Sequence, residues 1–158
     1  MKQSDIRAIL ERTAGVILEE SAYLFTALLD EGATPDVATW DAQGAAVSYE
    51  DEDKTVHGEV HLWYPPGIST IAAANMLGID EGDERAVSKG DDALREILNI
   101  VAGNVLSSIY GEDILFNLTV PYRLDRDVLM DDEASEMRAW LESEDYPLLC
   151  VFHEIQSK

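Results

Sequence analysis

The sequence predicts an α+β fold in which an antiparallel β-sheet packs against two long helices and one short helix. Two segments, residues 4–29 and 90–110, carry apolar residues at helical spacing. Other segments, such as residues 55–64, alternate apolar and polar residues as strands with one buried face do. The chain has 158 residues, 46% of them apolar, and no segment with the composition of a linker. We therefore expect a single domain over residues 1–158.

The first long helix is expected to begin at an N-cap formed by Ser4 or Asp5 and to stop near Gly32. After it, Val37–Trp40 is a candidate strand, and Ala45–Tyr49 is predicted to be one. The acidic residues that follow are expected to form a polar turn before the next strand.

That next strand is predicted over Thr55–Tyr64, where two prolines and a glycine follow it. Ser69 is expected to cap a short helix that stops before Gly78. The second long helix is predicted roughly over residues 90–110, with Gly111 ending it.

The last third of the chain is expected to complete the sheet. Ile114–Val120 has the composition of a strand. Glu133–Glu142 has a helical composition, but its apolar residues alternate, which favours a hairpin instead. Its turn would include Ser143, and its return strand would cover Pro147–Ile155.

The charge of the chain limits its partners. The formal net charge is −21, with 11 basic and 32 acidic residues. Nucleic acids and anionic membrane surfaces are bound through Lys and Arg, so neither is expected as a partner. Clusters of acids between the periodic segments are interpreted as solvated loops, with electrostatic steering of a basic partner as the alternative.

The compartment follows from cysteine usage and from the apolar runs. Cys150 is the one cysteine, which excludes an internal disulfide and fits a reducing compartment; it lies in an apolar run and is expected to be buried. The start of the chain has no apolar signal segment, and no apolar run approaches 18 residues. A soluble cytoplasmic protein is expected.

The second long helix carries a polar stripe opposite an apolar one. At about 100° per residue, Asp92, Glu96, Asn99 and Gly103 share one side. Glu96 and Asn99 are then neighbours, with about 5–6 Å between their Cβ atoms. The opposite side is formed by Leu94, Ile97, Leu98, Val101, Val105 and Ile109.

Gly103 is unusual inside a helix, because glycine there costs about 1 kcal/mol relative to alanine. A missing side chain on the polar stripe indicates that something approaches this face closely. The alternative is an ordinary solvated helix face that tolerates a glycine.

The pattern Glu96-x-x-Asn99-x-x-x-Gly103-Asn104, preceded by Asp92, resembles the signature of the CheC/CheX/FliY phosphatases of bacterial chemotaxis. It is most similar to the CheX-like members, which have a single such motif. The segment from Ala72 to Gly78 is similar to the short helix that precedes the signature helix in this family. The resemblance extends loosely over the whole chain, and residues 69–110 carry most of it.

The resemblance implies a phosphatase that acts on the aspartyl phosphate of a phosphorylated CheY-like response regulator. Asn99 would orient the attacking water, and Glu96 would pair with the active-site lysine of the regulator. Asp92, Gly103 and Asn104 would be partner-binding positions, with Gly103 allowing close approach and Asn104 giving structural support.

The same resemblance implies that the chain has no cofactor of its own and that the regulator supplies the Mg²⁺. It also implies a homodimer and a CheX-like arrangement of the sheet and helices. A non-catalytic docking module of a chemotaxis or two-component complex is the alternative function. The intact set of Glu96, Asn99 and Gly103 favours the enzyme, because a docking module has no need of the amide.

An internal repeat is considered because CheC-type chains contain two related helices. An offset of 85 residues aligns Glu96 with Glu11, Asn99 with Ala14 and Gly103 with Leu18. A first copy of this kind would lack the amide and be inactive.

Three residues of one strand, His57, Glu59 and His61, fall on one face and could suggest a metal site. His57 and His61 would lie about 13 Å apart, too far to share an ion. A His-x-Glu pair offers two ligands, and zinc needs at least one more from elsewhere. We therefore predict a solvated strand face without a metal, and we expect His153 to lie on a polar face as well.

Overall fold

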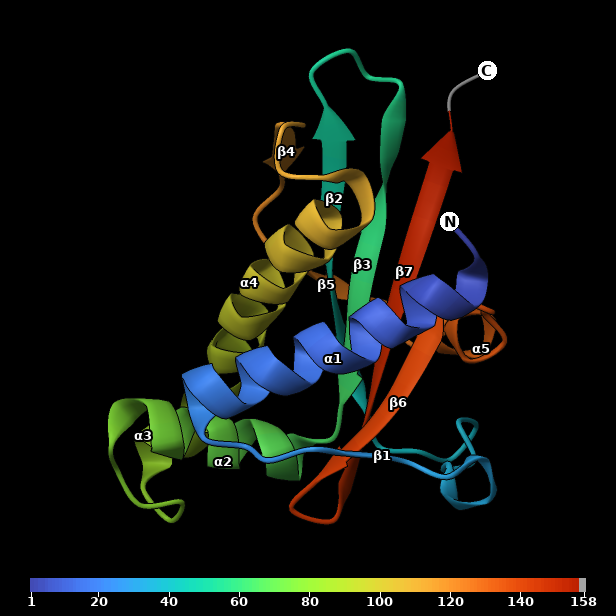
Figure 1. Cartoon of the computed structure of the whole chain (residues 1–158). Coiled ribbons are helices and arrows are strands. Elements are labelled where there is room, and N and C mark those ends of the chain that lie inside the picture. The colour runs from blue at the N-terminus through green and yellow to red at the C-terminus, as the bar shows by residue number, and fades with distance from the viewer. Residues whose placement is uncertain (157–158) are drawn as a thin grey trace.

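The computed structural model describes residues 1–156 and has the predicted α+β architecture, with long helices lying across one face of a twisted sheet (Figure 1). The helices are α1 (Gln3–Ala22), α2 (Pro66–Leu77), α3 (Glu84–Ser88), α4 (Gly90–Tyr110) and α5 (Val128–Glu133), with a 3₁₀ turn η1 (Glu31–Ala33). The strands are β1 (Ala27–Leu28), β2 (Gln43–Asp51), β3 (Val56–Tyr64), β4 (Phe116–Leu118), β5 (Tyr122–Leu124), β6 (Arg138–Ser143) and β7 (Tyr146–Gln156).

The described strands form one seven-stranded sheet in the order β1-β6-β7-β3-β2-β4, and β5 also pairs with β2. All of these strand pairs are antiparallel. The long strands β2, β3 and β7 form its centre, and β1, β4 and β5 are short strands at its margins.

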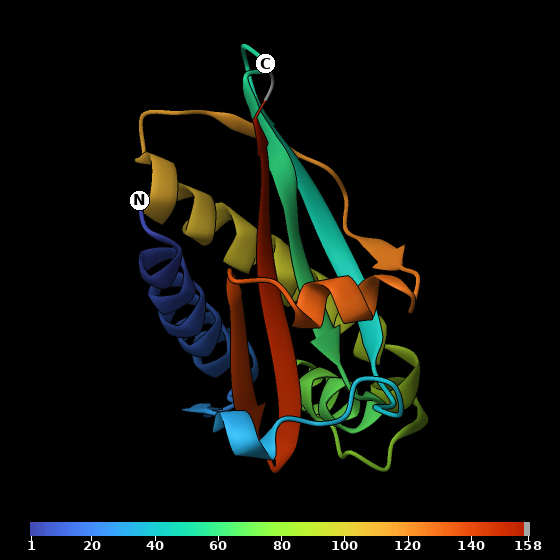
Figure 2. The same cartoon turned by 90° about the vertical axis from the view of Figure 1, so that its right-hand side faces the viewer.

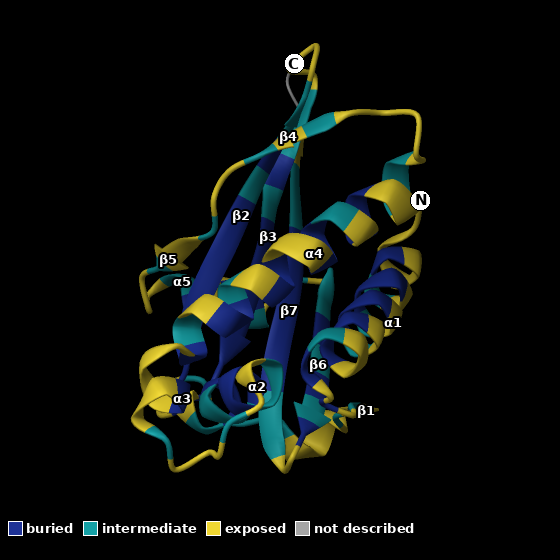
Figure 3. Ribbon diagram, turned by 90° about the vertical axis from the view of Figure 1, so that its left-hand side faces the viewer, coloured by how far each residue is buried: buried dark blue, intermediate teal, exposed yellow. Residues whose placement is uncertain are grey.

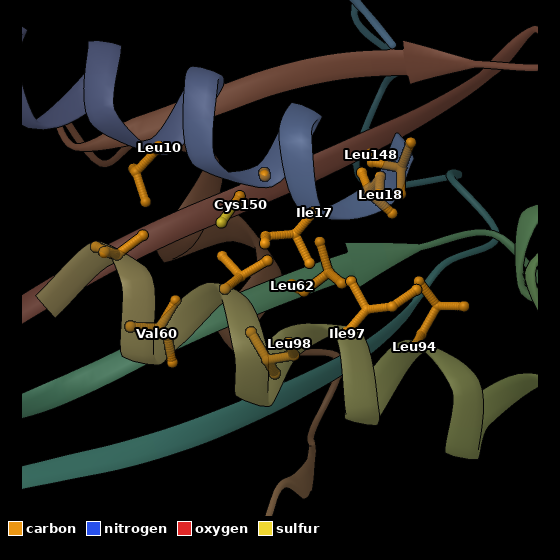
Figure 4. Packing of buried hydrophobic residues seen from close by; sticks show 14 of the residues in the cluster. Leu10, Ile17, Leu18, Val60, Leu62, Leu94, Ile97, Leu98, Leu148 and Cys150 are labelled. Carbon is orange, nitrogen blue, oxygen red and sulfur yellow. The ribbon is translucent and has the colours of Figure 1, made fainter. Parts of the chain in front are cut away.

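The main core lies between the sheet and the helices. Side chains alternate along β3, so Val60 and Leu62 point toward α1 and α4. Figure 4 shows these residues in the same packed layer as Leu18 and Leu98, which are 1% and 0% exposed. The helices are amphipathic because one stripe of each fills this layer.

The opposite face of the sheet carries a second, smaller core beneath α5 and the loop before β2 (Figure 2). Trp63 of β3 is fully buried there, as expected for a core residue, and Leu129 of α5 packs in the same cluster. The strands are therefore covered on both faces near the middle of the sheet.

The prediction for the first helix is wrong at its C-terminal end. The helix ends at Ala22, and Tyr23 takes a left-handed conformation with φ 55°. The chain then runs extended, so Leu28 pairs with Leu141 of β6 instead of continuing the helix. Gly32 lies within η1 and does not end the helix.

The candidate strand over residues 37–40 is a turn. The side chain of Asp36 accepts a hydrogen bond from the backbone N–H of Ala38 at 3.0 Å, and its carbonyl accepts one from Trp40 at 2.9 Å. An aspartate that bonds the backbone two residues ahead favours a turn over a strand.

The short helix begins earlier than predicted. It starts at Pro66, because proline fits the first turn of a helix, where its missing N–H is not needed. Ser69 therefore lies inside the helix, where its hydroxyl donates to the Pro66 carbonyl at 2.8 Å. The predicted end is correct, since Gly78 caps the helix with φ 68°.

The second long helix and the last hairpin are confirmed. The helix α4 covers residues 90–110 and is followed by Gly111. Strands β6 and β7 pair through a tight turn in which Glu144 and Asp145 both have positive φ. The expected strand over residues 114–120 shortens to β4, and neither β5 nor α5 was expected from the sequence.

Candidate functional site

The helix α4 presents its polar stripe to solvent. Leu94, Ile97 and Leu98 are completely buried against the sheet and the neighbouring helices. Glu96 and Asn99, one step around the helix, are exposed, and Figure 3 shows the outer surface of α4 as a run of exposed residues. The orientation expected from the sequence is therefore present.

The side chains of Glu96 and Asn99 have no polar partner among the described residues. Within residues 1–156, no hydrogen bond or ion pair involves the carboxylate of Glu96 or the amide of Asn99. An exposed acid and an exposed amide on a rigid helix are available to a second molecule, because no intramolecular bond has to break first.

Gly103 is not required by the packing of this chain. A Cβ atom built on it would meet nothing within 4 Å. Its backbone is helical, so no positive φ requires glycine either. The absent side chain therefore leaves space on the outer surface of α4, two turns of helix after Glu96.

The other two predicted positions are also on the surface. Asp92 is exposed in the first turn of α4. Asn104 is exposed, and its Nδ2 donates to the carbonyl of Ile100 at 2.8 Å, one turn back along the same helix. The Asn104 amide thus has a structural contact that the Asn99 amide lacks.

Close contacts with α2 fix the position of α4. Gly90 starts the helix so near to Ser69 that an added Cβ would lie 2.8 Å from the serine hydroxyl oxygen. The Asn75 amide of α2 donates to the carbonyl of Ala22 at 2.8 Å, which joins α2 to the end of α1. The Tyr64 hydroxyl donates to the Asp91 carboxylate at 2.9 Å and holds the first turn of α4 against β3.

A hollow of about 320 Å³ borders the stripe at its N-terminal end. Its wall includes Met76 and Leu77 of α2, and Glu96 lies on its margin. Arg85 and Lys89 also line it, which places two of the 11 basic residues of the chain beside the acidic end of the stripe.

The helix α1 has no corresponding site. Ala14 and Leu18, which the 85-residue offset aligns with Asn99 and Gly103, are buried in the core. That offset is therefore wrong as a structural alignment, because it places exposed positions of α4 over buried positions of α1. Residues 11–20 and 91–100 instead show the same order of buried and exposed positions.

The prediction of a solvated strand face around His61 is wrong. His61 is 4% exposed and contacts Asp132 of α5, which is fully buried. His61 Nδ1 lies 2.6 Å from Asp132 Oδ2, and His61 Nε2 lies 2.7 Å from Glu59 Oε1. Two further contacts converge on Asp132, from His153 Nε2 to Oδ1 at 2.7 Å and from Trp63 Nε1 to Oδ2 at 2.7 Å.

The donors around Asp132 explain why a buried carboxylate stays ionised. Burial alone would raise its pKa, but the hydrogen bonds from His153, His61 and Trp63 outweigh that effect and hold the pKa at about 2. His153 is half-buried and contacts this carboxylate, so it has a polar neighbour, but it lies on the same covered face as His61 and not on a solvated one. Asp132 was not predicted from the sequence, because it lies 71 residues from His61 and no local pattern marks it.

The single cysteine and the apolar segments of the chain suggest no further site. Cys150 is buried as predicted, and burial raises the pKa of its thiol to about 12, so it is not a nucleophile at neutral pH. None of the helices in the described part of the chain is long and apolar enough to span a membrane.

Comparison with known proteins gives one family. The family model for "Chemotaxis phosphatase CheX" matches residues 52–140, which is more than half of the 158 residues. The match begins at residue 52, directly after β2, and includes all of α4 with both Glu96 and Asn99. No curated protein matches the sequence.

Several solved structures share the fold. CheX from Vibrio vulnificus aligns with a TM-score of 0.66 at 13% identity, over 98% of this chain and 99% of that chain. The CheX–CheY–BeF3–Mg²⁺ complex from Borrelia burgdorferi contains a chain that aligns with a TM-score of 0.63 at 12% identity, over 94% of this chain and 97% of that chain. CheX from Desulfovibrio desulfuricans aligns with a TM-score of 0.62 at 11% identity, over 94% of this chain and 99% of that chain.

Proposed function

The chain belongs to the CheX family of chemotaxis phosphatases, and from that premise we propose that it hydrolyses the aspartyl phosphate of a CheY-like receiver domain through Glu96 and Asn99. The observation that carries this proposal is the exposure of these two side chains, which have no polar partner within residues 1–156, on a helix fixed by its core contacts. A carboxylate and an amide one helical turn apart can enter a partner site together.

The proposed reaction is an in-line attack of water on phosphorus. The bond between phosphorus and the aspartyl oxygen breaks, and the receiver aspartate leaves as a carboxylate. The water supplies its oxygen and both of its protons to the inorganic phosphate, which leaves as H₂PO₄⁻. An acyl phosphate is already reactive, so the acceleration comes mainly from holding the water in line. The Asn99 amide suits this role because it both donates and accepts hydrogen bonds and stays neutral at any cellular pH.

Glu96 is proposed to pair with the active-site lysine of the receiver. This pair would set the register of α4 in the receiver site and would not itself transfer a proton. Its neighbour Asp92 and the open space at Gly103 would then lie against the receiver surface, with Asn104 supporting the helix at the margin. The hollow lined by Met76 and Leu77 is next to Glu96 and could accept an apolar side chain of the same partner.

Mg²⁺ is proposed to come with the receiver and not from this chain. The Borrelia burgdorferi complex pairs a CheX with CheY, BeF3 and Mg²⁺. Around Asn99, the residues that the structure describes bring no three metal-ligating side chains together. A homodimer and a cytoplasmic location, which the family resemblance implies, belong to the same proposal.

Phosphate release from a panel of phosphorylated receivers tests the function. We expect the wild-type protein to accelerate release from at least one receiver and Asn99→Ala to lose a factor of about 10²–10³ in rate, as is typical for one positioning group. Glu19→Ala, at an exposed position of α1, is the matched control and should keep full activity.

Two outcomes would contradict the proposal. Full activity in Asn99→Ala would exclude the amide as the group that orients water. Binding of a phosphorylated receiver without any acceleration would favour the alternative, a docking module without hydrolase activity.

A further inference from the structure

The face of the sheet opposite α4 carries a cluster of side chains that the phosphatase proposal does not use. We call His61, Asp132 and His153 the His61–Asp132–His153 cluster. His61 pairs with Val151 and His153 pairs with Glu59 across β3 and β7, so the two histidines are diagonal neighbours on one face. Their ring centroids are 4.6 Å apart, and both rings contact Asp132 of α5. Figure 2 shows α5, in orange, crossing this face of the sheet.

We propose that this cluster binds one Zn²⁺ ion through His61 Nδ1, His153 Nε2 and the carboxylate of Asp132. One ligand atom from each residue lies within 4.8 Å of the others. Two atoms bound to the same zinc can be at most about 4.2 Å apart, since each lies about 2.0–2.1 Å from the ion. Ligand atoms of a tetrahedral zinc lie about 3.4 Å apart. His61 Nδ1 and His153 Nε2 now lie 2.6 and 2.7 Å from the Asp132 oxygens, so each of these contacts has to widen by about 0.7 Å for the ion to enter.

The side chains that hydrogen-bond the proposed ligands are of the types found around zinc sites. A histidine that binds metal through one nitrogen usually donates its other N–H to a carboxylate, and its ligating carboxylates are themselves hydrogen-bonded. His61 Nε2 contacts Glu59 Oε1 at 2.7 Å, and Trp63 Nε1 donates to Asp132 Oδ2 at 2.7 Å. Both ligands are therefore held from outside in the orientation that an ion needs.

The donor set favours zinc over magnesium or calcium. Two imidazole nitrogens and one carboxylate suit a borderline ion, whereas Mg²⁺ and Ca²⁺ prefer oxygen ligands alone. Three protein ligands leave a fourth position for water. The His153 side chain is 33% exposed, while those of His61 and Asp132 are 5% and 0% exposed, so the ion would enter from the His153 side.

Ion binding would replace protons. The two ligating nitrogens each share a proton with Asp132 in the hydrogen-bonded cluster, and both must be free of protons to bind metal. Zinc binding would therefore release protons to solvent and weaken as the pH falls. The ion would join α5 to β3 and β7, on the face of the sheet away from Glu96 and Asn99.

Competition for Zn²⁺ with a chromogenic chelator tests the site on the full chain after treatment with EDTA. We expect one tightly bound equivalent and a rise in the melting temperature when zinc is added. His153→Gln should weaken binding at least 100-fold, and Glu59→Gln should weaken it about 10- to 100-fold.

His57→Gln is the matched control, because it makes the same substitution on β3 about 13 Å from His61 and outside the cluster. It should bind zinc like the wild type. Circular dichroism would verify that each variant is folded. Equal zinc binding in the wild type and His153→Gln, or the absence of a tight equivalent in the wild type, would overturn the proposal, and neither result would affect the assay of phosphate release.

Discussion

The two long helices α1 and α4 pack on the same face of the sheet in nearly the same way but present different outer surfaces. Over residues 11–20 and 91–100 the order of buried, half-buried and exposed positions is identical. The core therefore imposes the same constraint on both helices, and packing alone does not distinguish them.

The difference lies at positions that the core does not constrain. An offset of 80 residues places Val16, Glu19 and Tyr23 of the α1 segment where α4 has Glu96, Asn99 and Gly103. Where α4 offers an acid, an amide and an empty position, α1 offers an apolar side chain, an acid and a bulky aromatic ring. The comparison teaches that two helices with the same buried stripe can differ at the outward positions that the core leaves free, and the proposed function depends on three such positions of α4.

The largest expected effects come from the shared core, where the two helices should behave alike. Leu18→Ala and Leu98→Ala remove equivalent side chains that are 1% and 0% exposed. Each should lower the free energy of unfolding by about 2–5 kcal/mol, because the lost burial adds to the cavity left behind. Urea denaturation would measure both. A loss below about 1 kcal/mol in only one of them would show that the packing is not equivalent.

Glu96→Gln on α4 should weaken receiver binding, whereas the same substitution on α1 should not. Loss of the proposed ion pair should raise the receiver concentration needed for half-maximal rate about tenfold, equivalent to 1.4 kcal/mol, with little change in the maximal rate. Glu20→Gln, an exposed acid on α1, is the control and should change neither value. The difference should shrink at high ionic strength, since salt screens exposed charges. An unchanged concentration dependence would count against the pair.

The parts of the fold that the sequence predicted are those set by local pattern. The spacing in α4 and the alternation in β3 identified both elements, because one stripe or one face of each is buried. The end of α1 was missed for a tertiary reason. Leu24 and Leu28 continue the helical spacing, yet Leu24 is buried beyond the helix and Leu28 pairs with β6. Long-range pairing overrode a local signal.

The same distinction separates the two candidate sites. Glu96 and Asn99 belong to one helix, so their spacing was enough to predict that they share an exposed face. The His61–Asp132–His153 cluster draws on β3, α5 and β7, and its members are brought together by strand register and by a helix that the sequence analysis did not predict. A single sequence contains no local pattern that predicts which distant residues will contact one another in the fold.

Gly103→Ala should move stability and activity in opposite directions. Alanine fits the helix without a clash and should stabilise the protein by about 1 kcal/mol. The added methyl group would fill the space left for the partner, so activity should fall several-fold. Ser108→Ala, at another exposed position of α4, controls for stabilisation of the helix alone and should leave activity unchanged. Full activity in Gly103→Ala would remove the argument for close approach there.

The smallest effect is expected from Asn104→Ala. This variant tests whether an exposed amide at another position of α4 can also orient the attacking water. The Asn104 amide bonds the Ile100 carbonyl of its own helix, so it does not point freely outward as the Asn99 amide does. An exposed bond of this kind contributes little, and alanine favours the helix, so stability should change by less than about 0.5 kcal/mol. The rate of phosphate release should stay within about twofold of the wild type, in contrast to the loss expected for Asn99→Ala. Equal losses in the two variants would mean that the water is held by the pair of amides, and that the exposure of Asn99 alone does not identify the working residue.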